Sequence, residues 1–501
     1  MANKIDSNVT GLSIAYETDI GVLPVTPVWY PLEPNSYSDF GPNIKTTPRE
    51  PISQSRQRRK GFVTDLDATA GWNQDLTQDN MTRHMQGFMF AAIREKYTTK
   101  PMNANQVPVT AVDASTGYAA AGSTGFAAGN IVKASGFALT ANNGIKTVVS
   151  STAPAVIMNA QVTEASPPAA AKLQKVGHQF AASDVAMTLN GGLARMTSTA
   201  NALGVLGLIP GEWVFVGGDS GPSAFAISRG WARASIVTAG YIEFDKTDWV
   251  PTAEAGTGKT AQVFIGSVLR TEEDPALQKR FTGTIERTLG FDANGQQAEY
   301  VSGSCANTLA INMPMANKIS LDLGYVAIDG STRTGTQGLM TGTRIPLDST
   351  DAFNTADDFS RIKMSLVDPT SSNVTPLFAY LMDLTINIGN NVTPNKALGK
   401  LGAFDTTAGM FTADGKLEAY FSNVTATSAV RNNADVTIDV VIAKQNAGMV
   451  FDLPLISLGG GLNKVEKDKP ITIPIDAMGA QSKFGHTMIY QNFAYLPNVA
   501  S

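Results

Sequence analysis

The stretch KISLDLGYVAIDG (318–330) alternates apolar and polar residues, which is the pattern of a β-strand with one buried face. Further segments in the same half of the chain share this alternation or carry β-branched runs, and turn residues separate them. They are SRIKMSLVDP (360–369), PLFAYLMDLTINIGNN (376–391), GKLEAYFSNVTA (415–426), ADVTIDVVIAKQN (434–446) and MVFDLPLISLGGG (449–461). This half of the chain is therefore predicted to be mainly β.

The composition of the 501-residue chain agrees with a β-rich, loop-rich protein. Charged residues are only 16%, well below the usual quarter, while glycine occurs 46 times and proline 25 times. The net charge of −5 argues against a general nucleic-acid-binding surface. Because Cys305 is the single cysteine, an intrachain disulfide is impossible, which is compatible with assembly in a reducing cytoplasm. The sequence also predicts neither a secretory signal nor a membrane anchor.

One long amphipathic helix is predicted in DLTQDNMTRHMQGFMFAAIREKY (75–97). Its apolar residues recur at helical spacing, so they are expected to fill the core beneath a sheet; the principal ones are Met81, Met85, Phe88, Met89 and Ile93. Asp79 or Asn80 is expected to cap its start. A single helix among strands should lie across one sheet and close its core.

The block from about 101 to 260 differs from its flanks, because Ala, Gly, Ser, Thr and Val dominate it. Within it, TGFAAGNIVKASGF (124–137) resembles LGLIPGEWVFVGGD (206–219), and an extended region follows each. We interpret the block as an inserted domain of two small β modules, at about 124–177 and 203–250. Such modules are expected to contribute surface rather than chemistry.

The stretch AEAGTGKT (253–260) raises the question of a phosphate-binding loop. Gly258, Lys259 and Thr260 match the end of the Walker pattern, but Ala253 stands where its first glycine belongs. A working loop also needs a following helix, whose N-terminus holds the phosphates. The residues after Lys259 are β-like instead, so a turn that re-enters the main domain is predicted.

Other combinations of polar residues give no catalytic, cofactor-binding or metal site. His84, His178 and His486 are widely spaced and do not pair with the cysteine. Asp65 and Asp67 in TDLDATAGWNQD (64–75) resemble the start of a calcium loop, but the required glycine and final glutamate are missing. A turn with capping carboxylates is predicted there. No enzyme activity is expected.

The strongest run of charge is SRQRRKG (55–61), which follows Pro48 and Pro51 and therefore predicts an extended arm or hairpin. Its cations could contact phosphate or acidic loops of a neighbouring subunit. In a chain of negative net charge, the protein contact is favoured. The predicted contact residues between subunits or rings are Arg49, Arg56, Arg58, Arg59 and Lys60.

Several stretches resemble the tail tube proteins of phages with long, non-contractile (siphovirus-type) tails. The first are GLSIAYETDIGVLPVTPVWYPL (11–32) and SYSDFGPNIKTTPREPISQSRQRRKGFVTDLDATAGW (36–72). Later ones, in the same order as in that family, are RFTGTIERTL (280–289), VSGSCANTLAI (301–311), DGKLEAYFSNV (414–424), VEKDKPITIPIDAM (465–478) and FAYLP (493–497). The resemblance covers about 1–100 and 261–501, and does not clearly cover the inserted block.

The resemblance implies β-sandwich or barrel tube domains with a flanking helix, which form stacked rings around a channel that carries DNA to the host. On the usual scale of domain sizes, 1–100 with 261–330 would form one tube domain and 331–501 a second. Three chains would then close a ring of pseudo-sixfold symmetry; six chains are the alternative. The implied partners are other copies of the chain, a tape-measure protein, and tail terminator and tip proteins. Genomic DNA would pass without specific binding.

The implied location is the virion tail, assembled in the host cytoplasm. The channel wall is expected to be poor in exposed cations and rich in Asp, Glu, Asn, Ser and Thr, because Lys and Arg contacts accumulate affinity for phosphate. The insert is expected to project outward, so that tubes would form without 103–258. The alternative function is an adhesive or carbohydrate-binding tail-tip or surface protein, suggested by Trp213, Trp231 and Trp249 within the insert.

Overall fold

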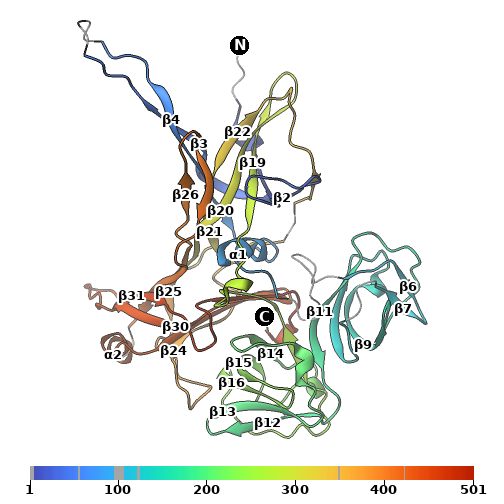
Figure 1. Ribbon diagram of the computed structural model, residues 1–501. Helices are drawn as coiled ribbons and strands as arrows, with labels where there is room; N and C mark the ends of the chain where they lie inside the picture. Colours follow the sequence, from blue (N-terminus) through green and yellow to red (C-terminus); the bar gives the residue numbers. More distant parts are fainter. Residues whose placement is uncertain are drawn as a thin grey trace. The chain divides into compact units, whose positions relative to one another are not determined.

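The structure is a computed structural model that describes residues 5–52, 54, 57–94, 107–120, 125–347, 350–421 and 424–500. It is mainly β, as predicted, with large antiparallel sheets and two short α-helices in the described part (Figure 1). The chain divides into two compact units. The first comprises the described residues of 1–90, 279–355 and 382–417, and the second those of 91–278, 356–381 and 418–501.

The first unit is built on one antiparallel arrangement of strands in the order β1–β19–β20–β21–β4–β3. The bounds of these strands are β1 Gly11–Tyr16, β19 Thr282–Phe291, β20 Gln296–Pro314, β21 Ser320–Ala327, β4 Phe62–Asp75 and β3 Pro34–Thr47. Further strands of the unit are β2 Val28–Leu32, β22 Asp329–Arg333, β23 Thr343–Arg344, β26 Thr393–Lys396 and β27 Ala403–Thr407. The stretch 318–330 thus supplies β21, at the centre of the sheet.

Helix α1, Met81–Met89, closes the core of the first unit. Met81, Met85, Phe88 and Met89 are all buried, as predicted. The helix packs against β20, and the ring of Phe88 lies 5.4 Å from that of Tyr325, on the buried face of β21. One face of the sheet is therefore apolar and covered, which leaves the opposite face for polar residues.

The predicted helix was too long at both ends. It ends at Met89 because Phe90 adopts the left-handed conformation (φ 47°), and Ile93 lies beyond it, half-buried rather than in the helical core. Residues 95–97 lie outside the described part. Asn80 does not cap the helix with its side chain; that side chain holds the preceding turn, with Nδ2 donating to the carbonyl of Asp75 (2.8 Å). Local turn geometry thus overrides the helical periodicity.

The second unit contains a sheet with β24 Phe359–Leu366, β29 Val436–Lys444, β30 Ala447–Gly460 and β31 Thr472–Gly479 in that order. A hairpin of β25 Leu381–Gly389 and β28 Thr412–Tyr420, most of which belongs to the first unit, precedes α2, Thr425–Arg431. The last residues of β28 belong to the second unit, where Thr472 of β31 donates to Glu418 (2.7 Å). The unit also includes β18 Ser267–Arg270 and β32 Ile489–Phe493, which pair with each other. No second helix was predicted, because the small residues of α2 carry little periodic signal.

The chain repeats one topology. The order β1–β19–β20–β21–β4–β3 has its counterpart in β24–β29–β30–β31–β28–β25. In both copies a hairpin leads into a short helix: β3 and β4 precede α1, and β25 and β28 precede α2. Two tube-type domains per chain stay a prediction, and the boundaries predicted for them differ from those of the compact units.

The block predicted as an insert forms two β modules, each with its own apolar core (Figure 1). The strands of the first are β5 Val107–Pro108, β6 Ala111–Asp113, β7 Gly117–Ala119, β8 Asn130–Ser135, β9 Gly144–Thr152 and β10 Ala155–Met158. Those of the second are β12 Val185–Asn190, β13 Leu193–Ser198, β14 Trp213–Val216, β15 Gly230–Val237, β16 Tyr241–Thr247 and β17 Gln262–Ile265. Strand β11, Lys172–Gln179, joins them, because it pairs with β8 on one edge and with β17 on the other.

The second module shares a core with the C-terminal strands of its unit. Trp213 and Trp231 are buried together with Val441, Val450 and Phe493. Beside this core, Arg233 of β15 donates to Asp245 (2.9 Å) and to Asp452 of β30 (3.0 Å). The module is therefore an integral part of the second unit rather than an appended decoration.

Candidate bore-lining face

The uncovered face of the first unit's sheet is hollowed into a groove of about 650 Å³. It crosses β3, β4, β21, β20, β25 and the start of β28. Strand alternation explains its chemistry: along β21, Leu321, Leu323 and Tyr325 are buried in the core, while Asp322 and Gly324 point to the groove. The sequence pattern that fixes the core therefore also determines which residues line this face.

The lining of the groove combines apolar and aromatic residues, such as Trp72, Leu323 and Tyr325, with small, amide and acidic ones, and no Lys or Arg is among them. The polar ones are Ser36, Ser38, Asp39, Thr69, Asn73, Asn307, Thr308, Asp322, Asn387, Thr412 and Asp414. Three of these are aspartates, so the groove is negatively charged. A face of this kind repels phosphate.

Amide side chains organise the carboxylates on this face. Asp322 accepts a hydrogen bond from Asn73 of β4 and another from Asn312 of β20, both at 2.7 Å. Both donors are neutral amides, so these hydrogen bonds bring no cation to the face. The result is a row of fixed hydrogen bonds across three neighbouring strands.

Three lysines near this face, Lys45, Lys318 and Lys396, are paired with carboxylates. Lys396 of β26 contacts both Asp65 (2.7 Å) and Asp67 (2.5 Å) of β4, and Lys45 of β3 contacts the same two aspartates. Hydrogen bonds from Lys396 lower the pKa of both aspartates. At the other end of β4, Lys318 contacts Asp75 (2.8 Å). Lys416, the next outward residue of β28 after Asp414, is exposed.

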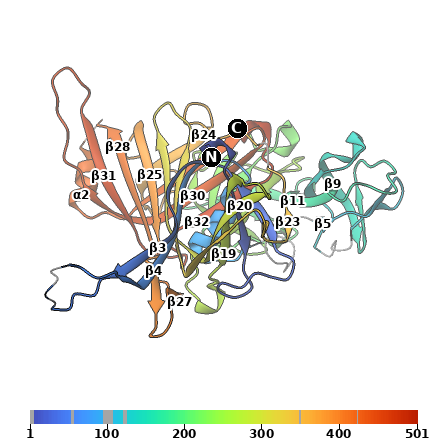
Figure 2. The same ribbon diagram turned by 90° about the horizontal axis from the view of Figure 1, so that it is seen from above.

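Asp65 and Asp67 do not form the predicted turn. They lie on one face of β4, two residues apart, where strand periodicity directs both toward Lys45 and Lys396. The stretch 64–75 is thus continuous with the strand β4 instead of forming a turn. The ion pairs join the β26–β27 hairpin to the β3–β4 hairpin, which extends beyond the other strands of its unit (Figures 1 and 2).

The predicted basic contact residues lie on the loop that joins β3 to β4. Arg49, Arg58, Arg59 and Lys60 are exposed there, whereas Arg56 lies outside the described residues. Arg58 contacts Glu50 at 3.5 Å. Apolar side chains nearby are exposed as well, among them Ile52 and Phe62. The tip of this hairpin therefore presents both charge and apolar surface, and its role in assembly stays a prediction.

The candidate phosphate loop is a turn, as predicted. Lys259 donates to the carbonyl of Gly221 (2.8 Å), and the strand β17 follows instead of a helix. His178 and His486 are buried, and burial lowers their pKa to about 4 and about 3. Within the described ranges, no three His, Cys, Asp or Glu residues are placed to hold a metal ion. Nor is any described helix long and apolar enough to cross a bilayer.

The tryptophans that suggested a carbohydrate-binding surface are core residues. Trp213 and Trp231 join the core shared with the C-terminal strands, and Trp249 is buried in the second module. A sugar-binding platform needs an exposed ring face, which none of these rings offers. The observation that favoured the adhesive alternative is therefore removed.

The residues of the groove were not predicted individually. Their strands were identified from alternation, but the pairing of β4 with β21 and of β20 with β25 joins residues far apart in the sequence. Asp322, Asn73 and Asn387 are ordinary solvent-facing strand residues in the sequence. Only the expectation of a wall rich in Asp, Asn, Ser and Thr could have pointed to them.

A family model described as phage tail tube protein matches residues 157–479, more than half of the chain. The match includes the whole second module, which the resemblance in the sequence did not clearly cover, and it leaves out residues 1–100, which the resemblance did cover. No curated protein matches the chain. The extent of the family match, together with the mainly β fold, shows that the chain belongs to the phage tail tube protein family and is a structural component of the virion tail.

Proposed function

We propose that this protein polymerises into stacked rings that form the tube of a long, non-contractile phage tail, through which genomic DNA passes into the host. The family membership supports the structural role. The groove on the first unit's sheet carries the proposal further, because none of its lining residues is a lysine or arginine. A surface that phosphate slides past must not hold it, since each cation contact adds affinity.

In this proposal, the polar face of the first unit lines the bore. The β3–β4 hairpin reaches a neighbouring ring with Arg49, Arg58, Arg59 and Lys60 at its tip. Three chains close a ring, because each chain carries two copies of one topology. Assembly takes place in the host cytoplasm on a tail initiator, a tape-measure protein sets the length, and a terminator ends the tube.

Negative-stain electron microscopy of the purified protein tests the polymer directly. Rings or long hollow tubes are expected, and end-on views should show pseudo-sixfold symmetry. A discrete globule that persists even beside tail initiator proteins would contradict the proposal.

A charge variant tests the bore. Asn387→Arg with Asp414→Arg adds cations to the proposed lining, and Ser150→Arg adds one to an exposed position on β9 of the first module. The bore variant is expected to form tubes but to slow DNA ejection from virions at low salt, with partial recovery at high salt. Equal ejection rates for the bore variant and the Ser150→Arg control would show that this face does not meet DNA.

A further inference from the structure

The two long central strands of the repeated topology, β20 and β30, have corresponding neighbours. On one edge of β20, β19 pairs up to Cys305 and β25 takes over from Thr308. The other edge carries β22 and then β21. On β30, β29 pairs up to Ile456, while β32 and then β31 occupy the other edge. Three of the four neighbours of β20 thus have a counterpart on β30.

The neighbour without a counterpart is β25. It forms a seven-residue ladder with β20, from Thr308 opposite Gly389 to Pro314 opposite Asp383. On β30 the corresponding edge begins after Ile456, in the segment SLGG (457–460). Among the described residues, no strand pairs with this edge of β30 beyond Ile456. Ser457 is small, and Gly459 and Gly460 carry no side chain, so these three residues place little bulk against a strand that pairs here.

Strand β3 is the topological equivalent of β25. Both are the first strand of a hairpin that leads into a short helix, and each pairs with the second strand of its hairpin. β25 uses its other edge to pair with β20, whereas the described part of β3 forms its ladder with β4. Side chains of β3 are exposed along most of its length, including Ser36, Ser38 and Asp39. Each chain therefore offers one strand edge and one matching acceptor edge.

We propose that residues 34–39 of β3 in one chain pair antiparallel with residues 457–460 of β30 in the next chain, repeating between chains the ladder that β25 makes with β20 within one chain. The inference rests on the proposed ring and names its contact surface. The contact joins different patches, so it is directional and propagates from chain to chain until the ring closes. Closure also protects two edges that would otherwise promote uncontrolled pairing.

The proposed ladder would continue the polar face between chains. Ser36, Ser38 and Asp39 already line the groove beside β4, and their counterparts on β25 are polar as well, with Asn387 next to Ala310 of β20. In the proposed ladder, Ser457 of β30 would take the place that a small residue such as Ala310 has on β20. No cation is introduced by either segment, so the uncharged and acidic character of the wall is preserved across the junction.

Cysteine cross-linking tests the pairing. The native Cys305 is fully buried, and burial raises the pKa of its thiol to about 11, so it stays unreactive at neutral pH. Ser38→Cys with Ser457→Cys places one thiol on each proposed edge. Ala310→Cys with Asn387→Cys, directly opposite in the β20–β25 ladder, is the intrachain positive control. Ser38→Cys with Ser150→Cys is the negative control.

Assembled protein treated with a short bismaleimide should give a ladder of covalent multimers for Ser38→Cys with Ser457→Cys, ending at three chains. The positive control should stay a single chain and the negative control should stay unlinked. A ladder that ends at six supports the pairing and corrects the number of chains in the ring. Tubes that form without this cross-link, or a link within one chain, overturn the inference and leave the tube function standing. Absence of tubes in the unmodified protein overturns the proposed function itself.

Discussion

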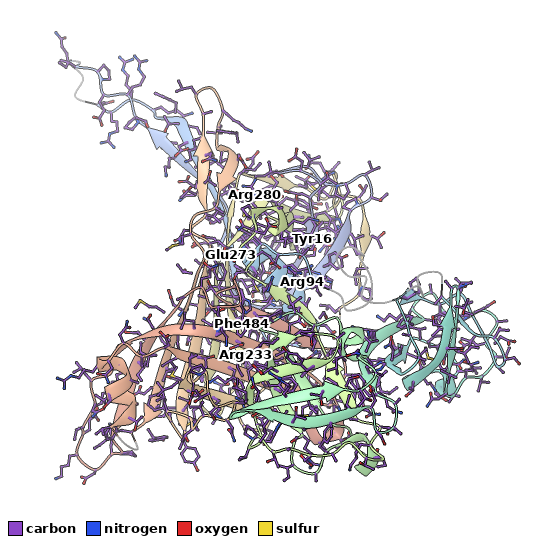
Figure 3. The ribbon with its side chains drawn as sticks, turned by 60° about the horizontal axis from the view of Figure 1, so that its bottom comes forward. Tyr16, Arg94, Arg233, Glu273, Arg280 and Phe484 are labelled. Carbon is purple, nitrogen blue, oxygen red and sulfur yellow. The ribbon has the colours of Figure 1, made fainter. Side chains whose placement is uncertain are left out.

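At the scale of single residues, the second unit depends on a buried group of charges around Arg233. Its guanidinium is 1% exposed and contacts Asp245 and Asp452, and the ring of Phe484 lies 5.4 Å from it (Figure 3). Trp213 donates to Asp452 as well (2.9 Å). Because these charges lie in the core, each partner depends on the others for its solvation.

We expect Arg233→Met to destabilise the unassembled protein by about 3–5 kcal/mol, because two buried carboxylates lose their cation. Urea unfolding followed by tryptophan fluorescence measures this loss. The matched control is Arg58→Met, which removes an exposed pair at the hairpin tip and should leave the midpoint unchanged. A small effect of Arg233→Met would show that water or neighbouring lysines replace the guanidinium.

Asp452 predicts a pH dependence. Burial raises the pKa of this carboxyl from 3.8 to about 6, despite the nearby Arg233. Because the pKa of Asp452 is higher in the folded state than in the unfolded state, the folded state binds this proton more tightly. The stabilisation from the bound proton is therefore complete below pH 3.8 and is lost as the pH rises through 6. From pH 4.5 to 7 this group should cost the wild type about 2 kcal/mol, and Asp452→Asn should remove that loss.

Asp245→Asn gives a control of opposite sign. Burial alone would raise the pKa of Asp245, but the charge of Arg233 lowers it below 3.8. Its contribution is therefore present above the unfolded pKa and is lost as the pH falls. Denaturant titrations of both variants at several pH values should diverge in opposite directions from the wild type. Parallel curves would refute the assignment.

At the scale of elements, helical periodicity determines which residues of α1 are buried, whereas local backbone geometry determines where the helix ends. The apolar spacing correctly identified Met81, Met85, Phe88 and Met89 as core residues, because a helix with one apolar face must bury it. Where the helix ends depends on the left-handed conformation of Phe90. Nothing in the surrounding sequence, such as a glycine, signals that turn.

Two alanine variants separate the predicted helix from the observed one. Phe88→Ala removes a fully buried ring that packs against Tyr325, and should destabilise by about 3–5 kcal/mol. Ile93→Ala lies beyond the helix in a half-buried position, and should cost clearly less. Thermal unfolding of both variants measures the difference. Equal losses would show that the helix and its core extend to Ile93.

At the scale of the whole molecule, the two modules within 107–265 are not equivalent. The first has its own core, of which Tyr118, Val156 and Leu173 are members. The second module contributes Trp213 and Trp231 to a core that it shares with the C-terminal strands. It also contributes Arg233 to an ion pair with Asp452 of those strands. Composition alone treated both as one decorative insert, because it cannot show which buried faces meet.

Two deletions test this difference. Removal of 107–171 takes away β5 to β10, and with them Ile131 of the shared core, but leaves β11 on β17 and both tryptophans of that core in place. It should give soluble protein that still assembles into tubes. Removal of 103–258, which composition suggested would be tolerated, exposes Val441, Val450 and Phe493 and leaves Asp452 without its cation. That protein should aggregate. Soluble yield and electron microscopy compare the two, and tubes from the larger deletion would refute the shared core.

The sequence by itself determined the mainly β fold, the core of α1 and the strand that contains 318–330, because alternation and helical spacing are local consequences of burying one face. It also indicated the tail tube family and predicted that 253–260 forms a turn followed by a strand. Only the tertiary structure decided which strands pair, and thus that Asn73, Asp322 and Asn387 meet in one cation-free groove. It also decided that the second module is part of a shared core. Both depend on contacts between residues hundreds of positions apart, which no local pattern encodes.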